Sequence, residues 1–286
     1  MNLNRIIKRS IYLLFAIASV SFLTSCTNEA VGDGNGLSDP NVDATFTITP
    51  LEGAVNKYTL DAQTTNVIGS KWDIGEGAFV GKMSEVISLP DAGTYTIKHT
   101  AIGRGGLTNT VSQELVVATS DPVAGNLIQG GKFADATDHS KWTILNISAS
   151  GASWTLNSGS ATIKGGGWNQ QGIYQAVQVQ ANKEYKIDMK VFGGGSSNTW
   201  FEVYASKTPP VQNSDYSADG RRMGMSTWDG CATSAFEGKL STVGCVGSGN
   251  VVKFAEAGTV YLVIKCGGEN IGATGISITN VEMRGK

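Results

Sequence analysis

Charge is scarce in this chain, and the little there is carries no basic excess. Charged residues make up 16% of the 286 positions, against roughly 25% in an average soluble protein. The 22 Lys and Arg are outnumbered by 24 Asp and Glu, which gives a formal net charge of −2. Binding to nucleic acid needs a basic surface that neutralises phosphates. The sequence therefore excludes a nucleic-acid partner.

Groups that perform catalysis are also few. The two histidines, His99 and His139, lie in an alternating strand pattern and in a polar loop, so we expect packing or surface roles for both. The sequence has no paired-His helix motif, nucleophile elbow, phosphate-binding glycine loop or EF-hand loop. We therefore expect no enzyme. A glycosidase needs only two carboxylates, and Glu202 and Asp229 are the pair considered for that alternative.

What the chain does contain begins with an N-terminal leader. Three basic residues precede an apolar run over residues 11–23, which is too short to cross a membrane core about 30 Å thick as a helix. The pattern predicts a signal peptide over residues 1–25. The run ends in Leu-Thr-Ser-Cys26, which resembles the lipobox of bacterial lipoproteins. The resemblance implies cleavage before Cys26 and lipidation of that cysteine; ordinary secretory cleavage is the alternative.

The rest of the chain divides into a tether and two β units. Residues 26–43 are rich in Gly, Asn and Asp without hydrophobic periodicity, so we expect a flexible tether. Short alternating segments then fill residues 44–119 and 125–286, and neither unit shows a helical period. We predict an all-β protein, an immunoglobulin-like sandwich followed by a jelly-roll sandwich. The expected strands are 45–49, 57–62, 71–74, 85–89, 94–101 and 112–118, then 159–164, 172–179, 184–192, 200–205, 250–254, 259–266 and 275–284.

Both units resemble known families. The turn Trp72-Asp-Ile-Gly-Glu-Gly77, with Gly93-Thr-Tyr95 downstream, is similar to that of PKD domains, and the resemblance makes Trp72 a core anchor. The second unit opens with Asn126-Leu-Ile-Gln-Gly-Gly-Lys-Phe133 and carries a hairpin over Phe254–Lys265. These features resemble carbohydrate-binding modules of the jelly-roll type, and the whole chain resembles surface glycan-binding lipoproteins of the Bacteroidetes polysaccharide-utilisation type.

The resemblance implies a location and partners. Such lipoproteins sit at the cell surface, lipid-anchored in the outer membrane, and capture polysaccharide for an outer-membrane importer. No catalytic cofactor is implied. Many such modules hold a structural Ca²⁺ near their first and last strands, and here Asp135, Asp138 and Glu282 are the residues that could supply oxygens.

Tryptophan is concentrated in the second unit, which holds five of the six. An indole face packs against the C–H patches of a pyranose ring, while the sugar hydroxyls need donors and acceptors at its rim. Trp168 stands in a glycine-rich segment beside Asn169 and Gln170, and we predict that all three contact a ligand. Trp228 lies in a polar loop, with Arg222 available to bind hydroxyls. Packing remains the alternative for each indole.

The segment after Trp200 alternates strictly. Phe201, Val203 and Ala205 face one way, which we expect to be the core. The ligand-facing set is then Trp200, Glu202 and Tyr204. Trp142 and Trp154 have strand-like apolar neighbours and are predicted to be core residues.

Three cysteines remain once Cys26 is assigned to lipid. Cys231 and Cys245 flank a short loop, and we predict a disulfide between them. Cys266 continues the apolar register of its strand and should be a buried thiol, with a Cys245–Cys266 bridge as the alternative.

Taken together, these patterns favour non-catalytic binding of a polysaccharide, with a β-glucan-like chain preferred. The alternatives are a protein-interaction or adhesin module, in which the exposed aromatic side chains meet a partner protein, and, less favoured, a polysaccharide-active enzyme.

Overall fold

The computed structural model describes residues 42–63, 67–75 and 77–286. The predicted signal peptide, the lipidation site Cys26 and nearly all of the predicted tether lie outside the described residues. Two compact units make up the described chain. Unit 1 contains residues 42–51, Tyr58–Ile87 and Thr94–Leu115, and unit 2 contains Glu52–Lys57, Ser88–Gly93 and Val116–Lys286. Within the described ranges, no helix has the length and apolar character needed to span a membrane.

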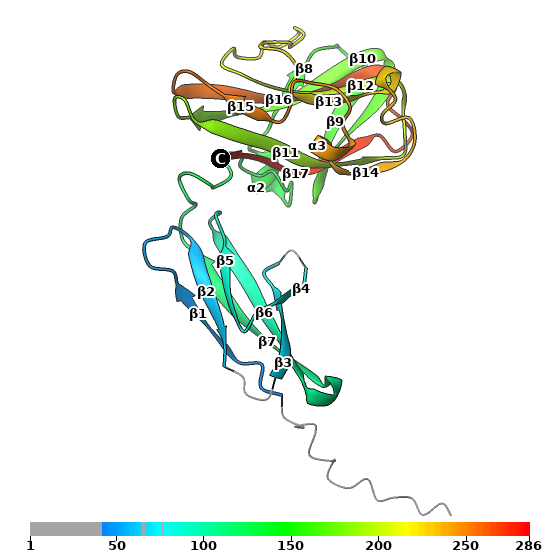
Figure 1. Cartoon of the computed structure of the whole chain (residues 1–286). Coiled ribbons are helices and arrows are strands. Elements are labelled where there is room, and N and C mark those ends of the chain that lie inside the picture. The colour runs from blue at the N-terminus through cyan, green and yellow to red at the C-terminus, as the bar shows by residue number, and fades with distance from the viewer. Residues whose placement is uncertain (1–41, 64–66, 76) are drawn as a thin grey trace, which may run out of the picture. The chain divides into compact units, whose positions relative to one another are not determined.

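Unit 1 is built from two antiparallel sheets, one with strand order β1-β2-β5 and the other β4-β3-β6-β7 (Figure 1). The strands are β1 (Phe46–Pro50), β2 (Lys57–Ala62), β3 (Val67–Asp73), β4 (Phe79–Gly81), β5 (Ser84–Ser88), β6 (Gly93–Gly103) and β7 (Thr108–Val117). A 3-10 turn, η1 (Arg104–Gly106), joins β6 to β7. Each predicted strand of this unit is present, and only the three-residue β4 was not expected.

The core of unit 1 centres on Trp72, which is fully buried. Its indole lies edge-on to the Phe46 ring at 5.3 Å and stacks on the His99 ring at 4.2 Å. His99 is itself buried, with its ring nitrogens bonded to Ala44 O and Ser70 Oγ. The expected packing roles of Trp72 and His99 are thus confirmed.

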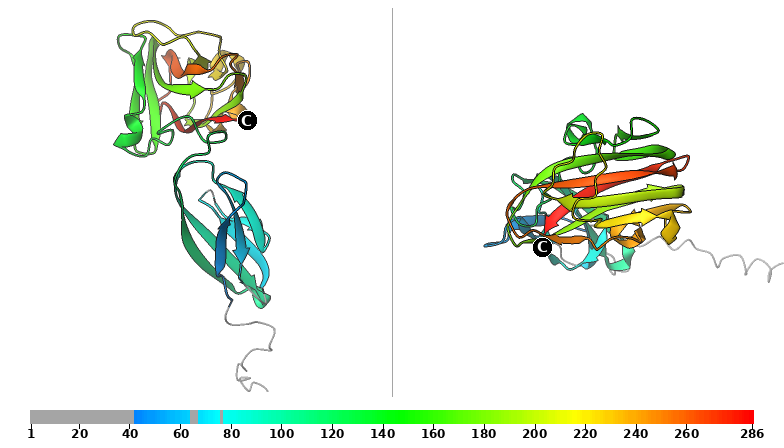
Figure 2. Two further views of the ribbon diagram at one scale, coloured as in Figure 1. Left: turned by 90° about the vertical axis from the view of Figure 1, so that its left-hand side faces the viewer. Right: turned by 90° about the horizontal axis from the view of Figure 1, so that it is seen from above.

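Unit 2 forms a jelly-roll sandwich, and the predicted all-β fold is confirmed. Its main strand order is β13-β12-β16-β10-β17-β11-β14, with β8 and β9 paired to β10 and β15 paired to β11. The right-hand view of Figure 2 shows β10, β16 and β12 side by side. The strands are β8 (Thr143–Asn146), β9 (Ala152–Asn157), β10 (Ser160–Val179), β11 (Glu184–Gly193), β12 (Ser197–Ser206), β13 (Met223–Ser226), β14 (Phe236–Lys239), β15 (Val251–Lys253), β16 (Gly258–Asn270) and β17 (Ile276–Gly285). Three short helical turns complete it: α2 (Ala136–His139), η2 (Thr227–Asp229) and α3 (Leu240–Val243).

Strand β10 belongs to both layers of this sandwich. Its first residues, 160–165, pair with β9 and β17, whereas residues 166–179 pair with β16 and, in part, β8. The change of partner falls in the segment Gly165-Gly-Gly-Trp168. Glycine is required there because a side-chain carbon at Gly165 would lie 1.9 Å from Gly151 O, and one at Gly166 2.0 Å from Glu269 O. The sequence predicted two strands here because these glycines interrupt the alternation.

The core of unit 2 lies between the two layers. It includes Phe201, Val203 and Ala205, all fully buried, as the alternation of β12 predicted. Trp142 and Trp154 are 6% and 7% exposed and belong to the same cluster, which confirms the prediction for both.

Candidate functional site

The outer face of the layer β8-β10-β16-β12-β13 is divided into a covered half and an open half. The cover is the long loop between β12 and β13, residues 207–222, which we call the strap. It reaches β8, where Gln212 accepts from Asn146 N and donates to Ile144 O. Because it crosses the middle strands to reach that edge, the strap shields the part of the face beneath it.

Tyr204 lies under the strap. Its ring packs with Tyr216 of the strap, Leu145 and Val263 in a separate buried cluster, and Tyr204 is only 4% exposed. Burial raises the pKa of its hydroxyl. The prediction that Tyr204 lines an open face is therefore wrong, because the strap supplies a second apolar layer that the alternation of β12 does not reveal.

Glu202 is also withdrawn from solvent, by ion pairs. Its carboxylate accepts from Arg221 at 2.9 Å, from Lys265 at 3.3 Å and from the Tyr204 hydroxyl at 2.8 Å. The Lys265 side chain is 4% exposed and also bonds Asp215 of the strap at 2.6 Å. These charges fasten the strap to the sheet, so a sugar hydroxyl would have to displace existing bonds to reach Glu202. The prediction that Glu202 faces an open surface is corrected accordingly.

The open half of the face begins at the next cross-strand row, which lies two residues before Glu202 in β12 and two residues after Lys265 in β16. There Gln170 of β10 and Trp200 of β12 both oppose Gly267 of β16. A side-chain carbon at Gly267 would lie 2.5 Å from Gln170 Cβ and 2.8 Å from Trp200 Cζ2. Because Gly267 has no side chain, the partly buried Trp200 ring can lie close to Gln170.

Trp168 is held outward by a β-bulge in β10. The pairing with β16 jumps from Gly166↔Asn270 to Asn169↔Gly268, so one extra residue is extruded. Trp168 takes a left-handed backbone conformation, with φ of 65°, which costs a non-glycine residue about 1 kcal/mol or more. Such backbone strain is typical of functional sites. The indole is 58% exposed.

Asn169 holds this bulge in place. Its side-chain Nδ2 donates to Gly166 O and to Gly167 O, both at 3.0 Å. These two donors are therefore occupied by the backbone. In the structure Asn169 positions Trp168. The sequence predicted that Asn169 contacts a ligand, but its side-chain donors are bound to the backbone.

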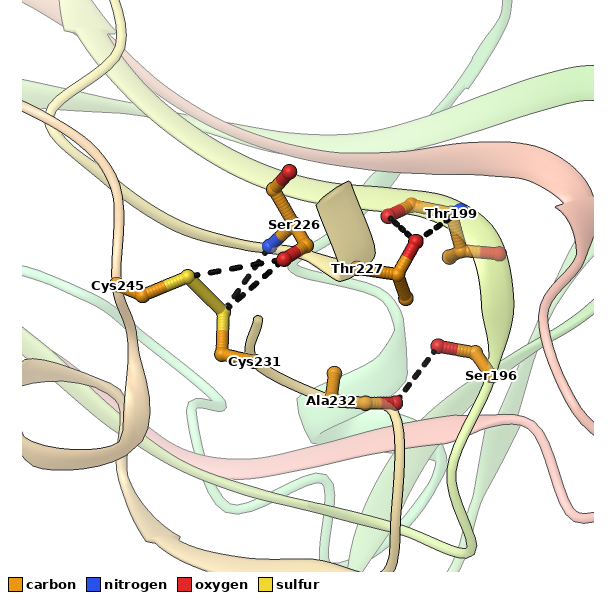
Figure 3. The surroundings of a disulfide bond; sticks show 7 residues. All are labelled: Ser196, Thr199, Ser226, Thr227, Cys231, Ala232 and Cys245. Carbon is orange, nitrogen blue, oxygen red and sulfur yellow. Dashed lines mark hydrogen bonds between the residues drawn. A yellow bond between two sulfur atoms is a disulfide. The ribbon is translucent and has the colours of Figure 1, made fainter. Parts of the chain in front are cut away.

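Trp228 belongs to η2. Figure 3 shows how the neighbouring Thr227 is bonded to Thr199 and how Ser226 is bonded to the disulfide cysteines. Thr227 Oγ1 accepts from Thr199 N at 3.0 Å and bonds Thr199 O at 3.3 Å. On the far side of η2, Cys231 N donates to Ser226 O at 3.2 Å. The Cys231–Cys245 disulfide is formed as predicted. The indole of Trp228 remains 56% exposed.

The three indoles come together at the open end of the face. The ring centroids of Trp168 and Trp228 are 6.3 Å apart with an interplanar angle of 22°, and those of Trp200 and Trp228 are 6.3 Å apart at 26°. We call this row of nearly parallel rings the indole ladder. Its members come from β10, β12 and η2, so the fold assembles it from segments that are distant in sequence.

Hydrogen bonding separates these indoles from the buried ones. The indole N–H groups of Trp72, Trp142 and Trp154 each donate to a backbone carbonyl, at 2.9, 3.0 and 3.0 Å. Among the described residues, no hydrogen bond engages the N–H of an indole-ladder ring. Nearby, Gln170 Oε1 is shielded from solvent and has no partner within the described chain. The open end therefore presents three indole N–H donors beside apolar ring surface, while the Gln170 acceptor lies beneath that surface, so the prediction that Gln170 contacts a ligand is not supported for this atom.

Arg222 stands apart from this arrangement. Its backbone N–H donates to Val203 O, which places it beside the strap-covered half of the face. Its Nε is shielded from solvent, and no side-chain hydrogen bond or ion pair of Arg222 is found in the described part of the chain. The structure does not join it to the indole ladder.

The remaining predictions concern Cys266 and calcium. Cys266 is a free, fully buried cysteine, as predicted, and burial raises the pKa of its thiol. Asp135 and Asp138 accept backbone N–H groups around α2, and Glu282 pairs with Arg284. Across the ranges that the structure describes, no group of three or more His, Cys, Asp or Glu side chains is arranged to hold a metal ion.

Sequence reasoning missed the residues that shape the site from below. Gly267 leaves room for the Trp200 ring beside Gln170. Lys265 and Arg221 form ion pairs with Glu202, and Asp215 of the strap forms an ion pair with Lys265. The only sequence signal for Gly267 was the interruption of an otherwise apolar strand by Gly267-Gly268, since glycine inside a strand often marks close approach of another group.

No family model matches the chain, and no curated protein matches it. One similar solved structure is of carbohydrate-binding modules from the β-sandwich superfamily, at 10% identity, covering 85% of this chain and 97% of that one, with a TM-score of 0.31. A CBM4 structure is similar at 16% identity over 56% of this chain and 99% of that one, with a TM-score of 0.36. The enzymatically active domain of tailspike protein 4 from bacteriophage CBA120 is similar at 11% identity over 60% of this chain and 23% of that one, with a TM-score of 0.38.

Proposed function

We propose that unit 2 binds a polysaccharide without turnover and that the indole ladder is its binding surface. The observation that carries the proposal is the gathering of three nearly parallel indoles at one open end of a sheet, two of them more than half exposed. Leaving such large apolar rings in water is unfavourable unless something covers them. A row of flat rings suits the repeating sugar rings of a chain.

The polar groups of the site support a sugar over a wholly apolar partner. A hydroxyl of a bound sugar can accept from an indole N–H of the ladder, and these N–H groups have no partner among the described residues. The charges around Glu202 are paired with one another, and the exposed carboxylate of Asp229 follows Trp228 in η2. A neutral glucan-like chain fits this balance, because its hydroxyls can donate to a carboxylate and accept from indole N–H groups.

The whole chain would then act as a surface capture protein. In this proposal lipid on Cys26 anchors it to the outer membrane, unit 1 is a PKD-like spacer, and captured glycan passes to a neighbouring importer. Affinity at a single site would be modest, and many anchored copies on one long chain would retain it by multivalency.

Affinity electrophoresis in gels that contain β-glucans tests the binding. We expect Trp168→Ala together with Trp228→Ala to abolish retardation, while Trp168→Phe with Trp228→Phe, which keeps flat rings, restores part of it. Unaltered retardation of the Ala variant would contradict the proposal. Release of reducing ends from the glycan would instead favour an enzyme, and binding only to a protein partner would favour an adhesin.

Anchoring is tested separately. Metabolic labelling with a fatty acid should mark the protein and fail to mark Cys26→Ala. Protease treatment of intact cells should remove the labelled protein if it faces outward, and protection from protease would contradict a surface location.

A further inference from the structure

Unit 2 has a second concave site, built from residues outside the indole ladder. A pocket of about 580 Å³ lies where the end of β11, strand β14 and the start of β17 meet. Its volume falls within the usual range of small-ligand pockets. It is lined by Phe192, Gly193, Gly194, Ala235, Phe236, Glu237, Thr274, Gly275 and Ser277.

One cross-strand row supplies an aromatic ring between two polar groups. Phe192 of β11 pairs with Ser277 of β17 on one side and with Glu237 of β14 on the other. Directly opposed residues in adjacent strands point to the same face. Phe192 is partly buried, whereas the Glu237 side chain is 64% exposed, so the ring is flanked by a hydroxyl and an accessible carboxylate.

Two glycines in the lining of this pocket are in close contact with their neighbours. A side-chain carbon at Gly193 would lie 2.9 Å from the Phe236 ring, and one at Gly194 would lie 2.9 Å from Thr274 Oγ1. Glycine at these two positions therefore allows the Phe236 ring and Thr274 to pack directly against the backbone and form part of the pocket wall.

The exposed Lys190–Glu237 pair is the polar part of this pocket that a polyhydroxylated ligand can reach, whereas the hydroxyls of Thr274 and Ser277 are held by bonds within the protein. Glu237 pairs with Lys190 at 2.5 Å, which presents an acceptor and a donor side by side. Thr274 Oγ1 accepts from Gly194 N at 3.1 Å, and Ser277 Oγ shares a hydrogen bond with Thr162 at 2.8 Å. A carboxylate accepts from two neighbouring hydroxyls at once, while the face of Phe192 offers apolar contact to ring C–H groups.

We infer that this pocket is a second subsite for a neutral sugar of the glucan type. The inference rests on the proposed function for the ligand class but on different residues for the site. A molecule with two subsites would hold a long glycan more firmly than one site alone, because the second contact becomes intramolecular.

Isotope-edited NMR on the Trp168→Ala/Trp228→Ala variant tests the pocket by itself, since the indole ladder is disabled there. The probes are the β-1,3- and β-1,4-linked tetrasaccharides of glucose at millimolar concentration. We expect saturable shifts of the backbone amides of Gly193, Gly194 and Gly275. Adding Phe192→Ala should weaken this binding about tenfold or more, and Glu237→Gln should weaken it several-fold.

A matched control separates recognition from general loss of charge. Glu256→Gln removes another exposed carboxylate, which pairs with Lys207 at 3.0 Å and does not line the pocket, and it should leave the shifts unchanged. Absence of shifts at the three glycines, or equal shifts after Phe192→Ala, would overturn the second subsite. Neither result bears on the indole ladder, whose own test is gel retardation of the protein with both tryptophans present.

Discussion

Replacing Trp168 by glycine and by alanine separates its backbone strain from its ring. Both changes delete the indole and its contact with Trp228, worth about 0.5–1.5 kcal/mol. Both variants must adopt the left-handed φ of 65° found at this position, but this conformation strains alanine and not glycine. In an ordinary strand, glycine is less stable than alanine by roughly 0.5–1 kcal/mol. Here we expect the reverse order, with Trp168→Gly more stable than Trp168→Ala by about 1 kcal/mol.

Calorimetry of the unit 2 transition measures this difference. For a domain of this size, 1 kcal/mol corresponds to a Tm difference of about 2–4 °C. Both variants should lose glycan affinity equally, by about tenfold, since Trp side chains commonly dominate binding energy. Trp154→Ala is the opposite control, because its ring is 7% exposed and its removal should cost about 3–5 kcal/mol of stability.

Two results would refute this reasoning. If the alanine variant matched or exceeded the glycine variant in stability, position 168 would not hold its left-handed conformation in solution. If both variants bound glycan as the original protein does, the strain would serve no contact with the ligand.

Four further predictions follow from the same geometry. Gln170→Ala should weaken glycan binding less than Trp168→Ala does, because the Gln170 acceptor is shielded from solvent; titration calorimetry checks it, and a loss as large as that of Trp168→Ala would contradict this placement of Gln170. Replacing Cys231 and Cys245 by serine opens a loop of sequence separation 14, which should lower stability by about 3 kcal/mol. Glycan binding should weaken as well, because the loop that carries Trp228 becomes less rigid. A large loss of stability with full affinity would show that this loop keeps its conformation without the disulfide. Cys266 should resist alkylation in the native protein and react only after denaturation, because it is buried and burial raises the pKa of its thiol; mass spectrometry counts the added groups. Glu202→Gln should lower stability by about 2 kcal/mol by depriving buried Lys265 of one partner and leave glycan affinity nearly unchanged; loss of affinity at normal stability would return Glu202 to the binding surface.

Buried and exposed tryptophans could be distinguished from the sequence because their neighbouring residues differ. Trp154 has alternating apolar neighbours and is buried, while Trp168 follows three glycines and projects into solvent. Local composition determines how closely the chain can pack around each ring, so this information is present in short segments. The same holds for the alternation in β12, which placed Phe201 in the core.

The failures came from contacts between distant segments. Tyr204 is covered by Tyr216 of the strap, and Glu202 is held by Lys265 from β16. Neither contact leaves a periodic trace, because a loop that folds back over a sheet is polar and irregular in sequence. The short strands β13 and β14 were missed for a related reason: four residues are too few to establish an alternation against the turn residues around them.

The shared strand β10 also has a consequence for how unit 2 forms. Its partners β16 and β17 begin at Gly258 and Ile276, far downstream of Ser160, so the pairing that joins β10 to the central strands of both layers is long-range. Topologies of high contact order fold slowly. During synthesis neither layer can close until the last strands have emerged, and the nascent unit remains an open chain for most of its translation.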